Sequence, residues 1–503
     1  GDSIAGLGMT GSSFKSPHVK LLNPSPNVSR TLTVSGFIMF LEVYSDREQA
    51  IASFVEAETQ PLALLQDKRI LFVMGSYPGK RPMYERAREL GLKLVVLDGP
   101  GHWTQAAVQE GLFEQFIEVD LHPHHSLADR AYQAIQASGL HFDGIATFEE
   151  FAGALTALLA QGLGLPGHPF LAASFSRDKM LTREVCMEAG IPSPRFARIK
   201  SIDDLEAAAG QVGFPAVLKP VSGASSAAAY RVDDEQQLRQ RYTQTMAVAQ
   251  GPLKTSGVHS DDEQELVWAS GFDMILEAYL DGEEFDVDCL LSAGEMVYAA
   301  VTHDWPQPYL REVGAEMPPL FPVEKQEEMV RLTREILKVL GFVNGVFHVE
   351  VKYTGNGPRL IEVNARLGGG TRYQMNKAIW GVDLVDQYLM SALNMPIRPD
   401  KAALPLAGVA ESWLPCPASG VIARTDFLES LAGSPHVLYQ KLSVKTGQRV
   451  VGPGDGIPDS LGLVLVQSDT VEEAVRILNE LISRVEVPLQ QGDGSTVSVK
   501  IQG

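Results

Sequence analysis

Two short segments with alternating apolar and polar residues, Phe347–Lys352 and Leu360–Arg366, constrain the fold more than any other feature of the chain. A turn rich in glycine, asparagine and proline separates them, which predicts an antiparallel pair of strands. In such a pair Glu350 and Glu362 face each other, and Asn364 lies on the same side as Glu362. Two carboxylates and an amide on rigid strands suit Mg²⁺, which usually shares its ligands with water and nucleotide phosphates. The hairpin therefore points to ATP chemistry, with an ordinary solvated strand face as the alternative.

The composition predicts several globular domains and small-molecule partners. A chain of 503 residues, 45% of them hydrophobic, is too long for a single core. The balance of 42 Lys+Arg against 62 Asp+Glu gives a net charge of -20, which would repel both a nucleic-acid backbone and an anionic membrane. The three cysteines, Cys186, Cys289 and Cys416, form no CxxC motif or Cys/His cluster. We therefore expect neither a disulfide framework nor a zinc site, no nucleic-acid or membrane partner, and a cytoplasmic location.

Strand and helix patterns divide the chain into units of mixed type. An apolar run at Lys68–Gly75 precedes a helical pattern at Pro82–Leu90 and a second strand at Leu94–Leu97, which predicts a parallel sheet covered by helices. Shorter strands at Ala216–Lys219 and Ala228–Val232 predict a small α+β unit, and the hairpin lies in another α+β unit. The chain is therefore expected to be α/β and α+β multidomain.

Two further segments carry groups suited to a nucleotide. Lys219 ends an apolar strand just before the small-residue stretch Ser222–Ser226, where an ammonium group, hydroxyls and N–H groups can meet phosphate oxygens. The alternative is an exposed lysine at a strand end. The segment Ile275–Asp288 begins as a strand whose main chain could pair with an adenine edge. It then supplies Glu284, seven residues after Glu277, which could accept from ribose hydroxyls.

Together, in this order, these residues resemble the ATP-grasp superfamily over roughly residues 68–400. The best-conforming parts are LEAYLDGEEFDVD and HVEVKYTGNGPRLIEVNARLGGG. The step of 12 residues between Glu350 and Glu362 (362 minus 350) matches the family's usual spacing. The ending Asn-Ala-Arg-Leu-Gly-Gly-Gly looks most like the branch of L-amino-acid (dipeptide) ligases and carnosine synthase. One departure is Ala228, in a phosphate loop that usually has glycine at that position.

The resemblance implies a role for each matching residue. Nucleotide binding would fall on the two lysines, the small-residue loop, the connecting strand and the acid after it: Lys179, Lys219, Ser225, Ser226, Glu277, Ala278, Tyr279, Leu280 and Glu284. The metal, Mg²⁺ (or Mn²⁺), would be held by Glu350, Glu362 and Asn364. Arg366 would be the catalytic residue, stabilising an acyl-phosphate and the following oxyanion. The N–H groups of Gly368, Gly369 and Gly370 would hold a substrate carboxylate.

It also implies an ATP-grasp architecture with an N-terminal parallel α/β domain, a small lid domain and a central ATP/Mg-binding α+β domain. The expected boundaries are an N-terminal extension at 1–67, the N-terminal domain at 68–193, the lid subdomain at 194–273, the catalytic subdomain at 274–400, and a C-terminal α+β domain at 401–503. A homodimer is compatible with the resemblance.

The implied reaction joins two amino acids. The carboxylate of one would attack the γ-phosphoryl of ATP to give an acyl-phosphate and ADP, and the amine of the other would displace phosphate. A carboxylase or purine-pathway ligase acting on bicarbonate or formate is the alternative among enzymes, and a non-catalytic ATP-binding module is the alternative outside them. His303 and Asp304 fall where a substrate amino group could be contacted, but a surface loop explains them equally well, so they stay outside the catalytic set.

Overall fold

The computed structural model describes residues 20–22, 42–44, 62–121, 126–223, 228–249, 273–306, 310–453, 455, 457–490 and 495–501. The chain forms two compact units, residues 1–68 with 90–92, and residues 69–89 with 93–503. In the first unit the strands β1 (Lys20–Leu22) and β2 (Glu42–Tyr44) pair in parallel. All elements below belong to the second unit. No helix within the described ranges is both long enough and apolar enough to span a bilayer.

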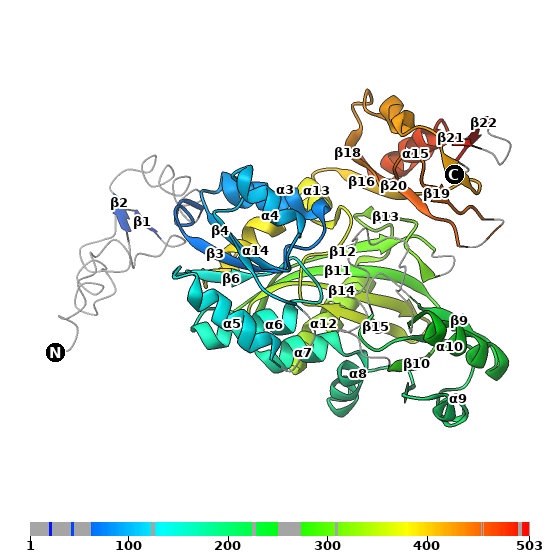
Figure 1. Ribbon diagram of the computed structural model, residues 1–503, viewed down its shortest axis with the longest axis horizontal. Helices are drawn as coiled ribbons and strands as arrows, with labels where there is room; N and C mark the ends of the chain where they lie inside the picture. Colours follow the sequence, from blue (N-terminus) through cyan, green and yellow to red (C-terminus); the bar gives the residue numbers. More distant parts are fainter. Residues whose placement is uncertain are drawn as a thin grey trace. The chain divides into compact units, whose positions relative to one another are not determined.

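The second unit begins with a parallel sheet of four strands in the order β5-β4-β3-β6 (Figure 1). Its strands are β3 (Arg69–Val73), β4 (Lys93–Asp98), β5 (Gln115–Glu118) and β6 (Gly144–Ala146), and its helices are α3 (Arg81–Glu89), α4 (Trp103–Gln109), α5 (Leu127–Ala137) and α6 (Gly153–Leu163). The central residues of β3 and β4 are apolar and buried, as expected of a parallel sheet that helices cover. The predicted parallel α/β unit is confirmed.

Two helices, α7 (Phe170–Arg177) and α8 (Lys179–Glu188), lead into a small antiparallel sheet of the order β7-β10-β8-β9. Its elements are β7 (Phe196–Ile199), α9 (Leu205–Val212), β8 (Ala216–Pro220), β9 (Tyr230–Val232), α10 (Glu235–Ala249) and β10 (Met274–Ala278). The strand expected to start at Ala228 starts two residues later. Ala228 has φ +56°, a left-handed conformation that cannot continue a strand.

The largest sheet has eight strands in the order β15-β14-β11-β12-β13-β16-β20-β18. Its elements and their helices are β11 (Glu283–Ser292), β12 (Glu295–Asp304), β13 (Gly314–Met317), α12 (Val323–Leu340), β14 (Gly345–Thr354), β15 (Gly357–Asn364), α13 (Arg372–Trp380), α14 (Leu384–Ala392), β16 (Gly408–Pro415), β18 (Val437–Leu442) and β20 (Ser460–Ser468). β16 pairs with β13, so the sheet runs across position 400, where a domain boundary is expected. The boundary itself stays a prediction.

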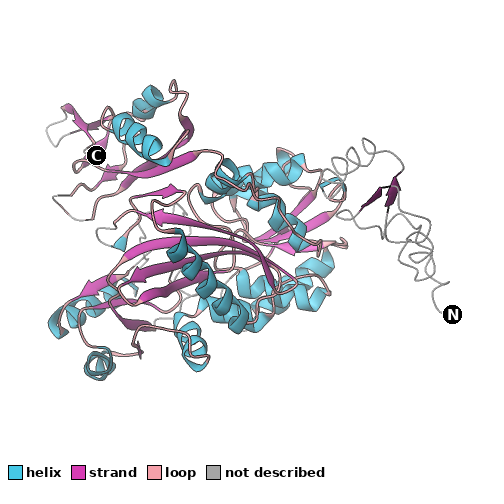
Figure 2. Cartoon of the chain, turned by 180° about the vertical axis from the view of Figure 1, so that it is seen from behind, coloured by secondary structure: helices cyan, strands magenta, loops and turns pink. Residues whose placement is uncertain are grey.

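Alternation along these strands gives the sheet two unlike faces. On one face, residues such as Phe285, Val287 and Val349 pack with α12 in a buried apolar core. Helices cross this region in the view from behind (Figure 2). The residues between them along the strands, such as Asp286 and Glu350, lie on the other face. The sheet therefore separates its apolar core from a face rich in carboxylates.

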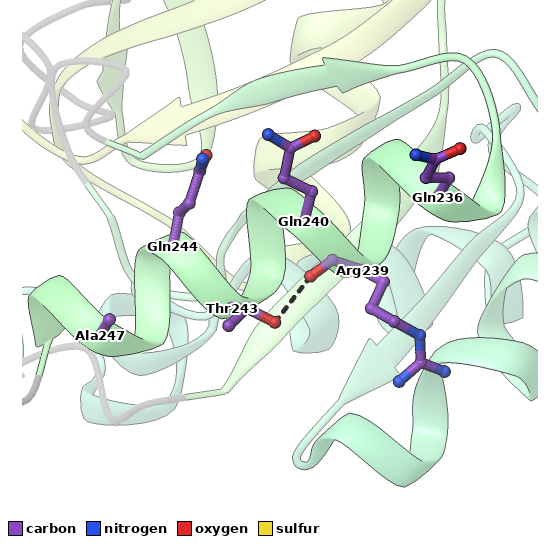
Figure 3. Close-up of a pocket in the computed structure, with 6 residues that line it drawn as sticks. All are labelled: Gln236, Arg239, Gln240, Thr243, Gln244 and Ala247. Atoms are coloured by element: carbon purple, nitrogen blue, oxygen red, sulfur yellow. Dashed lines mark hydrogen bonds between the residues drawn. The ribbon is translucent and has the colours of Figure 1, made fainter.

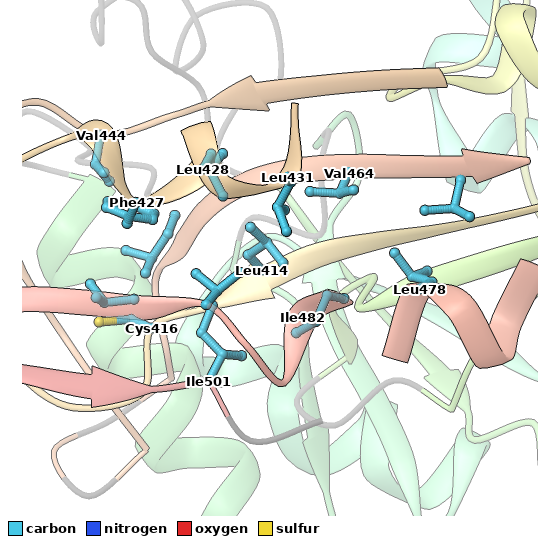
Figure 4. Close-up of a cluster of buried hydrophobic side chains, with 14 of the residues drawn as sticks. Leu414, Cys416, Phe427, Leu428, Leu431, Val444, Val464, Leu478, Ile482 and Ile501 are labelled. Carbon is cyan, nitrogen blue, oxygen red and sulfur yellow. The ribbon is translucent and has the colours of Figure 1, made fainter. Parts of the chain in front are cut away.

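The last hundred residues add a second core. The elements β17 (Gly420–Ile422), β19 (Arg449–Val450), β21 (Glu486–Gln490) and β22 (Thr496–Lys500) form a four-stranded sheet, and α15 (Val471–Ile482) packs against β16 and β20. The helix begins at Val471, where the Thr470 side chain caps it by accepting from the Glu473 N–H. Leucine, isoleucine and valine side chains of these elements fill the space between them (Figure 4).

Candidate active site

The predicted metal ligands lie together on the carboxylate-rich face. Glu350 of β14 is directly opposite Glu362 of β15, so the predicted facing positions are confirmed. Asn364 Nδ2 donates to Glu350 Oε1 at 3.2 Å. Burial, followed by the negative charges of Glu362 and Asp286, raises the pKa of Glu350 well above its usual range. Two crowded carboxylates of this kind fit a divalent cation, which would relieve their repulsion.

Lys179 joins this pair of acids from another element. It is the first residue of α8, whose start is set by the Asp178 side chain accepting from the Leu181 N–H. Its ammonium group donates to Glu362 Oε1 and to the Gly223 carbonyl, both at 2.9 Å. The lysine is 6% exposed, so its position is well defined by these partners. One of the two predicted phosphate-contacting lysines thus touches a predicted metal ligand.

The second lysine, Lys219, is held by Glu277. The Glu277 carboxylate lies 2.7 Å from Lys219 Nζ and 2.6 Å from Arg183 Nε. Burial opposes its ionisation, but the charges of Arg183 and Lys219 outweigh burial and lower the pKa of Glu277 to about 2. Glu277 was singled out for its main chain, and its side chain proves to be the centre of an ion-pair cluster. Arg183 was missed, although it lies four residues after Lys179 and so on the same side of α8.

The predicted adenine-binding segment ends β10. The N–H groups of Ala278 and Tyr279 already donate to the carbonyls of Arg195 and Pro215, at 2.8 and 3.0 Å. Pro215 has no N–H to return, so it cannot pair with the Tyr279 carbonyl. Leu280 lies two residues beyond the end of the strand.

Glu284, the predicted ribose contact, starts the carboxylate-rich face of β11 and lies 3.7 Å from Lys352 Nζ. It pairs in register with Asp304 of β12. Ser225 and Ser226 lie outside the described residues. No observation here tests the assignment of these residues to a nucleotide, which stays a prediction.

Arg366 forms an ion pair with a carboxylate of the N-terminal parallel unit. Its Nε donates to Glu150 Oε2 at 2.5 Å, and Arg177 Nη1 lies 2.5 Å from Glu150 Oε1. Burial disfavours the Glu150 charge, but Arg366 and Arg177 lower the pKa of Glu150 to about 2. Arg366 Nη2 also donates to Asn364 Oδ1 at 3.4 Å. The predicted catalytic arginine therefore lies beside the predicted metal ligands, aimed by an acid that the sequence pattern did not single out.

A second buried arginine, Arg372, organises the neighbouring part of this face. Its Nε donates to Asp286 Oδ2 at 2.7 Å, its Nη2 donates to Asp304 Oδ1 at 2.6 Å, and its Nη1 bonds to Glu411. Three buried carboxylates thus surround one guanidinium. Burial and the Asp286 charge raise the pKa of Asp304 well above its usual range despite Arg372.

This cluster corrects the reading of His303 and Asp304 as a surface loop. Asp304 is 3% exposed and lies in β12 on the carboxylate-rich face. His303 lies on the opposite face, stacked on Phe285 and bonded to Glu316 at 2.7 Å. The period of two along Glu284 to Asp288 was the available signal for this acidic face.

The glycine run connects Arg366 to α13. A side chain on Gly368 would place its first carbon 2.8 Å from both His348 Nδ1 and Arg372 Cβ, so the main chain there must approach both residues closely. Gly370 has φ +54°, which favours glycine. Gly369 has open space around it. The run is therefore built for close approach at the site, and its contact with a substrate carboxylate remains a prediction.

A hollow of about 470 Å³ lies away from these residues, along one side of α10 (Figure 3). Its lining is Gln236, Arg239, Gln240, Thr243, Gln244 and Ala247. It contains a single charged side chain and no carboxylate that could hold a metal. We therefore place the chemistry on the carboxylate-rich face.

Comparisons with known proteins agree with this geometry. Three family models match the chain, the ATP-grasp N-terminal domain at residues 84–167, the ATP-grasp domain at 212–374, and the L-amino acid ligase C-terminal domain 2 at 412–490. The crystal structure of an L-amino acid ligase from Bacillus licheniformis superposes with a TM-score of 0.69 at 22% identity, covering 85% of this chain and 100% of that one. The fold is the ATP-grasp fold.

The sequence relatives of this chain include enzymes named as synthases and ligases of amino acids. Carnosine synthase 1 from Homo sapiens is 31% identical over 354 residues, which is 67% of this chain and 41% of that protein. Alanine–anticapsin ligase from Bacillus subtilis is 27% identical over 264 residues, 50% of this chain and 54% of that one. The chain is homologous to carnosine synthase and to bacterial L-amino acid ligases. It spans about two fifths of the length of the carnosine synthases it matches.

Proposed function

We propose that this protein is an ATP-dependent carboxylate–amine ligase that forms an amide bond between two amino acids and releases ADP and phosphate. Its homologues named carnosine synthase and alanine–anticapsin ligase support the reaction class. The observation that carries the proposal is the convergence of Lys179, Glu350, Glu362, Asn364 and Arg366 at one place. Amino acids as small-molecule partners and a cytoplasmic location belong to the same proposal.

The acids would hold the metal and the lysines the phosphates. Glu350, Glu362 and Asn364 supply the oxygen ligands that Mg²⁺ prefers, and the crowding of the two carboxylates supports a cation between them. A divalent ion held there would neutralise charge that develops at the γ-phosphoryl group. Lys179 and Lys219 would add fixed positive charge to the phosphates.

Arg366 would serve the second half of the reaction. Its guanidinium is held by Glu150 beside Asn364, so it can stabilise the acyl-phosphate and then the oxyanion that forms when the amine attacks. Gly368 to Gly370 would hold a substrate carboxylate through main-chain N–H groups. The excess of carboxylates around Arg372 suits a substrate that carries an ammonium group.

The domain division belongs to this proposal too. Residues 194–273 would act as a lid that brings Lys219 to the nucleotide, and residues 274–400 would carry the metal site. A lid would exclude water from an acyl-phosphate that water can hydrolyse.

The test is mass spectrometry of the products from ATP, Mg²⁺ and a pool of the twenty standard L-amino acids. We expect a dipeptide and stoichiometric ADP. AMP as the stoichiometric product would overturn the proposal. ADP release with bicarbonate or formate but never with amino acids would favour the small-acid ligases instead. ATP binding without any turnover would favour a binding module.

A further inference from the structure

The N-terminal parallel sheet has a topological switch point beside the site. The strand order β5-β4-β3-β6 places β3 between β4, which follows it in the chain, and β6, which lies on its other side. In open parallel sheets, ligands bind outside the carboxyl ends of the strands where the order reverses. The segment after β6 carries Glu150, which fastens Arg366. The segment after β3, residues 74–80, lies at the same edge and has no role in the site described so far.

This segment is held in a defined conformation. The Gly75 N–H donates to Asp98 Oδ2 at 2.6 Å, and the Ser76 carbonyl accepts from Trp103 Nε1 at 2.6 Å. Met74 and Ser76 have φ values of +59° and +56°, which non-glycine residues rarely adopt. Such conformations persist where surrounding contacts enforce them, and they cluster at functional sites. The fixed segment ends at Lys80.

Lys80 is a buried cation without an ion-pair partner among the described residues. It is 6% exposed, and within the described residues its ammonium group has no carboxylate at ion-pair distance. Its ring contact is Tyr77, with Nζ 5.7 Å from the ring centre, and Lys441 Nζ from β18 lies 5.3 Å from the same centre. The pKa of Lys80 falls to about 8, chiefly through burial and then through the charge of Arg366. Glu149 and Glu150 partly offset this effect.

Lys80 and Lys441 thus lie at one tyrosine ring, and within the described residues neither ammonium group has a carboxylate at ion-pair distance. Of the two acids nearby, Glu150 is already paired with Arg366 and Arg177, and Glu149 Oε1 accepts from the Phe151 N–H at 3.3 Å. A buried ammonium group without a counter-charge is costly, and a ligand carboxylate would remove that cost. Gly79 allows the approach of Lys441, because a side chain there would collide with the Tyr77 ring and with Lys441 Nζ.

We propose that Lys80, with Tyr77 and Lys441, binds the carboxylate of the amine-donating amino acid. The inference rests on the proposed function and deepens it, since it names the residues that hold the carboxylate of the acceptor amino acid. The free amine adds to the acyl-phosphate carbonyl carbon, which forms the C–N bond and an oxyanion, and the oxyanion then collapses as the C–O bond to phosphate breaks. The nitrogen then loses one proton to the departing phosphate. Lys80 holds the far end of the acceptor during this step and touches none of the bonds that change.

The experiment compares acceptors with and without a carboxylate. The acceptors are the twenty L-amino acids, their carboxamides, and hydroxylamine, which traps the acyl-phosphate as a hydroxamate. For Lys80→Met we expect an apparent KM for the amino-acid acceptors about 10- to 100-fold higher, the range of a lost charged hydrogen bond. We expect hydroxamate formation and reaction with the carboxamides to stay within about twofold of wild type. Lys80→Arg should recover part of the KM loss.

Lys401→Met is the matched control, because Lys401 also lies over an aromatic ring, that of Trp380, at 4.1 Å. It should leave the acceptor KM unchanged, and thermal unfolding of each variant checks the fold. An unchanged KM in Lys80→Met would overturn the inference. So would an equal fall in hydroxamate formation, a fall in kcat at constant KM, or a preference for phosphorylated amines. If the wild-type protein releases no ADP with any amino acid, the proposed function itself fails, a result seen before any variant is made.

Discussion

Each predicted cationic residue of the site is paired with a carboxylate from a different element. Lys179 meets Glu362, and Lys219 meets Glu277. The two carboxylates lie 2.9 and 2.7 Å from their lysines, so these pairs hold the cations in fixed positions. A bound nucleotide would then meet fixed positive charges and would need little rearrangement of side chains.

At this scale, Glu362→Gln should lower amino-acid-dependent ADP release by at least about 100-fold. The amide keeps the shape of the side chain but loses the charge that would bind the metal and pair with Lys179. Thermal unfolding should change little. Glu328→Gln is the control, because Glu328 lies on α12, across the sheet, and bonds to Tyr353 at 2.6 Å. Wild-type turnover of Glu362→Gln at saturating Mg²⁺ would contradict the assignment.

Removing Arg366 should affect both catalysis and stability, and a double variant separates the two effects. Arg366→Met should abolish amide formation and cost about 3 kcal/mol of stability, because Glu150 loses one of its two cations. Arg366→Met with Glu150→Gln removes both charges. We expect it to regain most of the stability and none of the activity, as measured by urea unfolding and product formation. Recovery of activity in the double variant would show that Arg366 is structural only.

At the scale of elements, alternating residues along the strands of the eight-stranded sheet place apolar side chains on one face and carboxylates on the other. Phe285 and Val287 hold the sheet on its core, while the alternate residues Glu284 and Asp286 project to the site. A shift of one residue would exchange the two faces, so burial of the apolar face fixes the register. Packing in the core thereby sets the positions of the acids.

Two alanine-to-glycine substitutions in the small antiparallel unit should change its stability in opposite directions. Ala228 has φ +56°, so Ala228→Gly should stabilise the small antiparallel unit by about 0.5–1 kcal/mol by relieving the left-handed conformation. Ala207→Gly, at an exposed position inside α9, should instead destabilise it by about 1 kcal/mol. Hydrogen exchange of peptides covering β8 and α9 reports both changes. Slower exchange in Ala207→Gly or faster exchange in Ala228→Gly would contradict this account.

At the scale of the whole second unit, the eight-stranded sheet joins the region of the site to the C-terminal region. β16 and β20 extend the sheet beyond β13, and Glu411 of β16 reaches Arg372. A chain cut at residue 400 would leave the edge of β13 unpaired and Arg372 with one acid fewer.

We therefore expect a fragment of residues 62–400 to aggregate, whereas 62–503 should stay folded. Exposed strand edges and uncovered apolar surface both favour association between copies. Size-exclusion chromatography and circular dichroism of the two fragments provide the measurement. A monomeric, cooperatively unfolding 62–400 fragment would show that the five strands of the sheet before residue 400 suffice.

The sequence by itself determined the features that depend on near neighbours along the chain. Glu350 and Glu362 face each other because a short turn joins two alternating strands, and Lys219 lies at the end of an apolar strand. The tertiary structure alone decided which acid each cation meets. Lys179 and Glu362 are 183 residues apart, and Arg366 and Glu150 are 216 residues apart. Such pairs come from separate elements brought together by packing of their apolar faces, and no local periodicity records the partner.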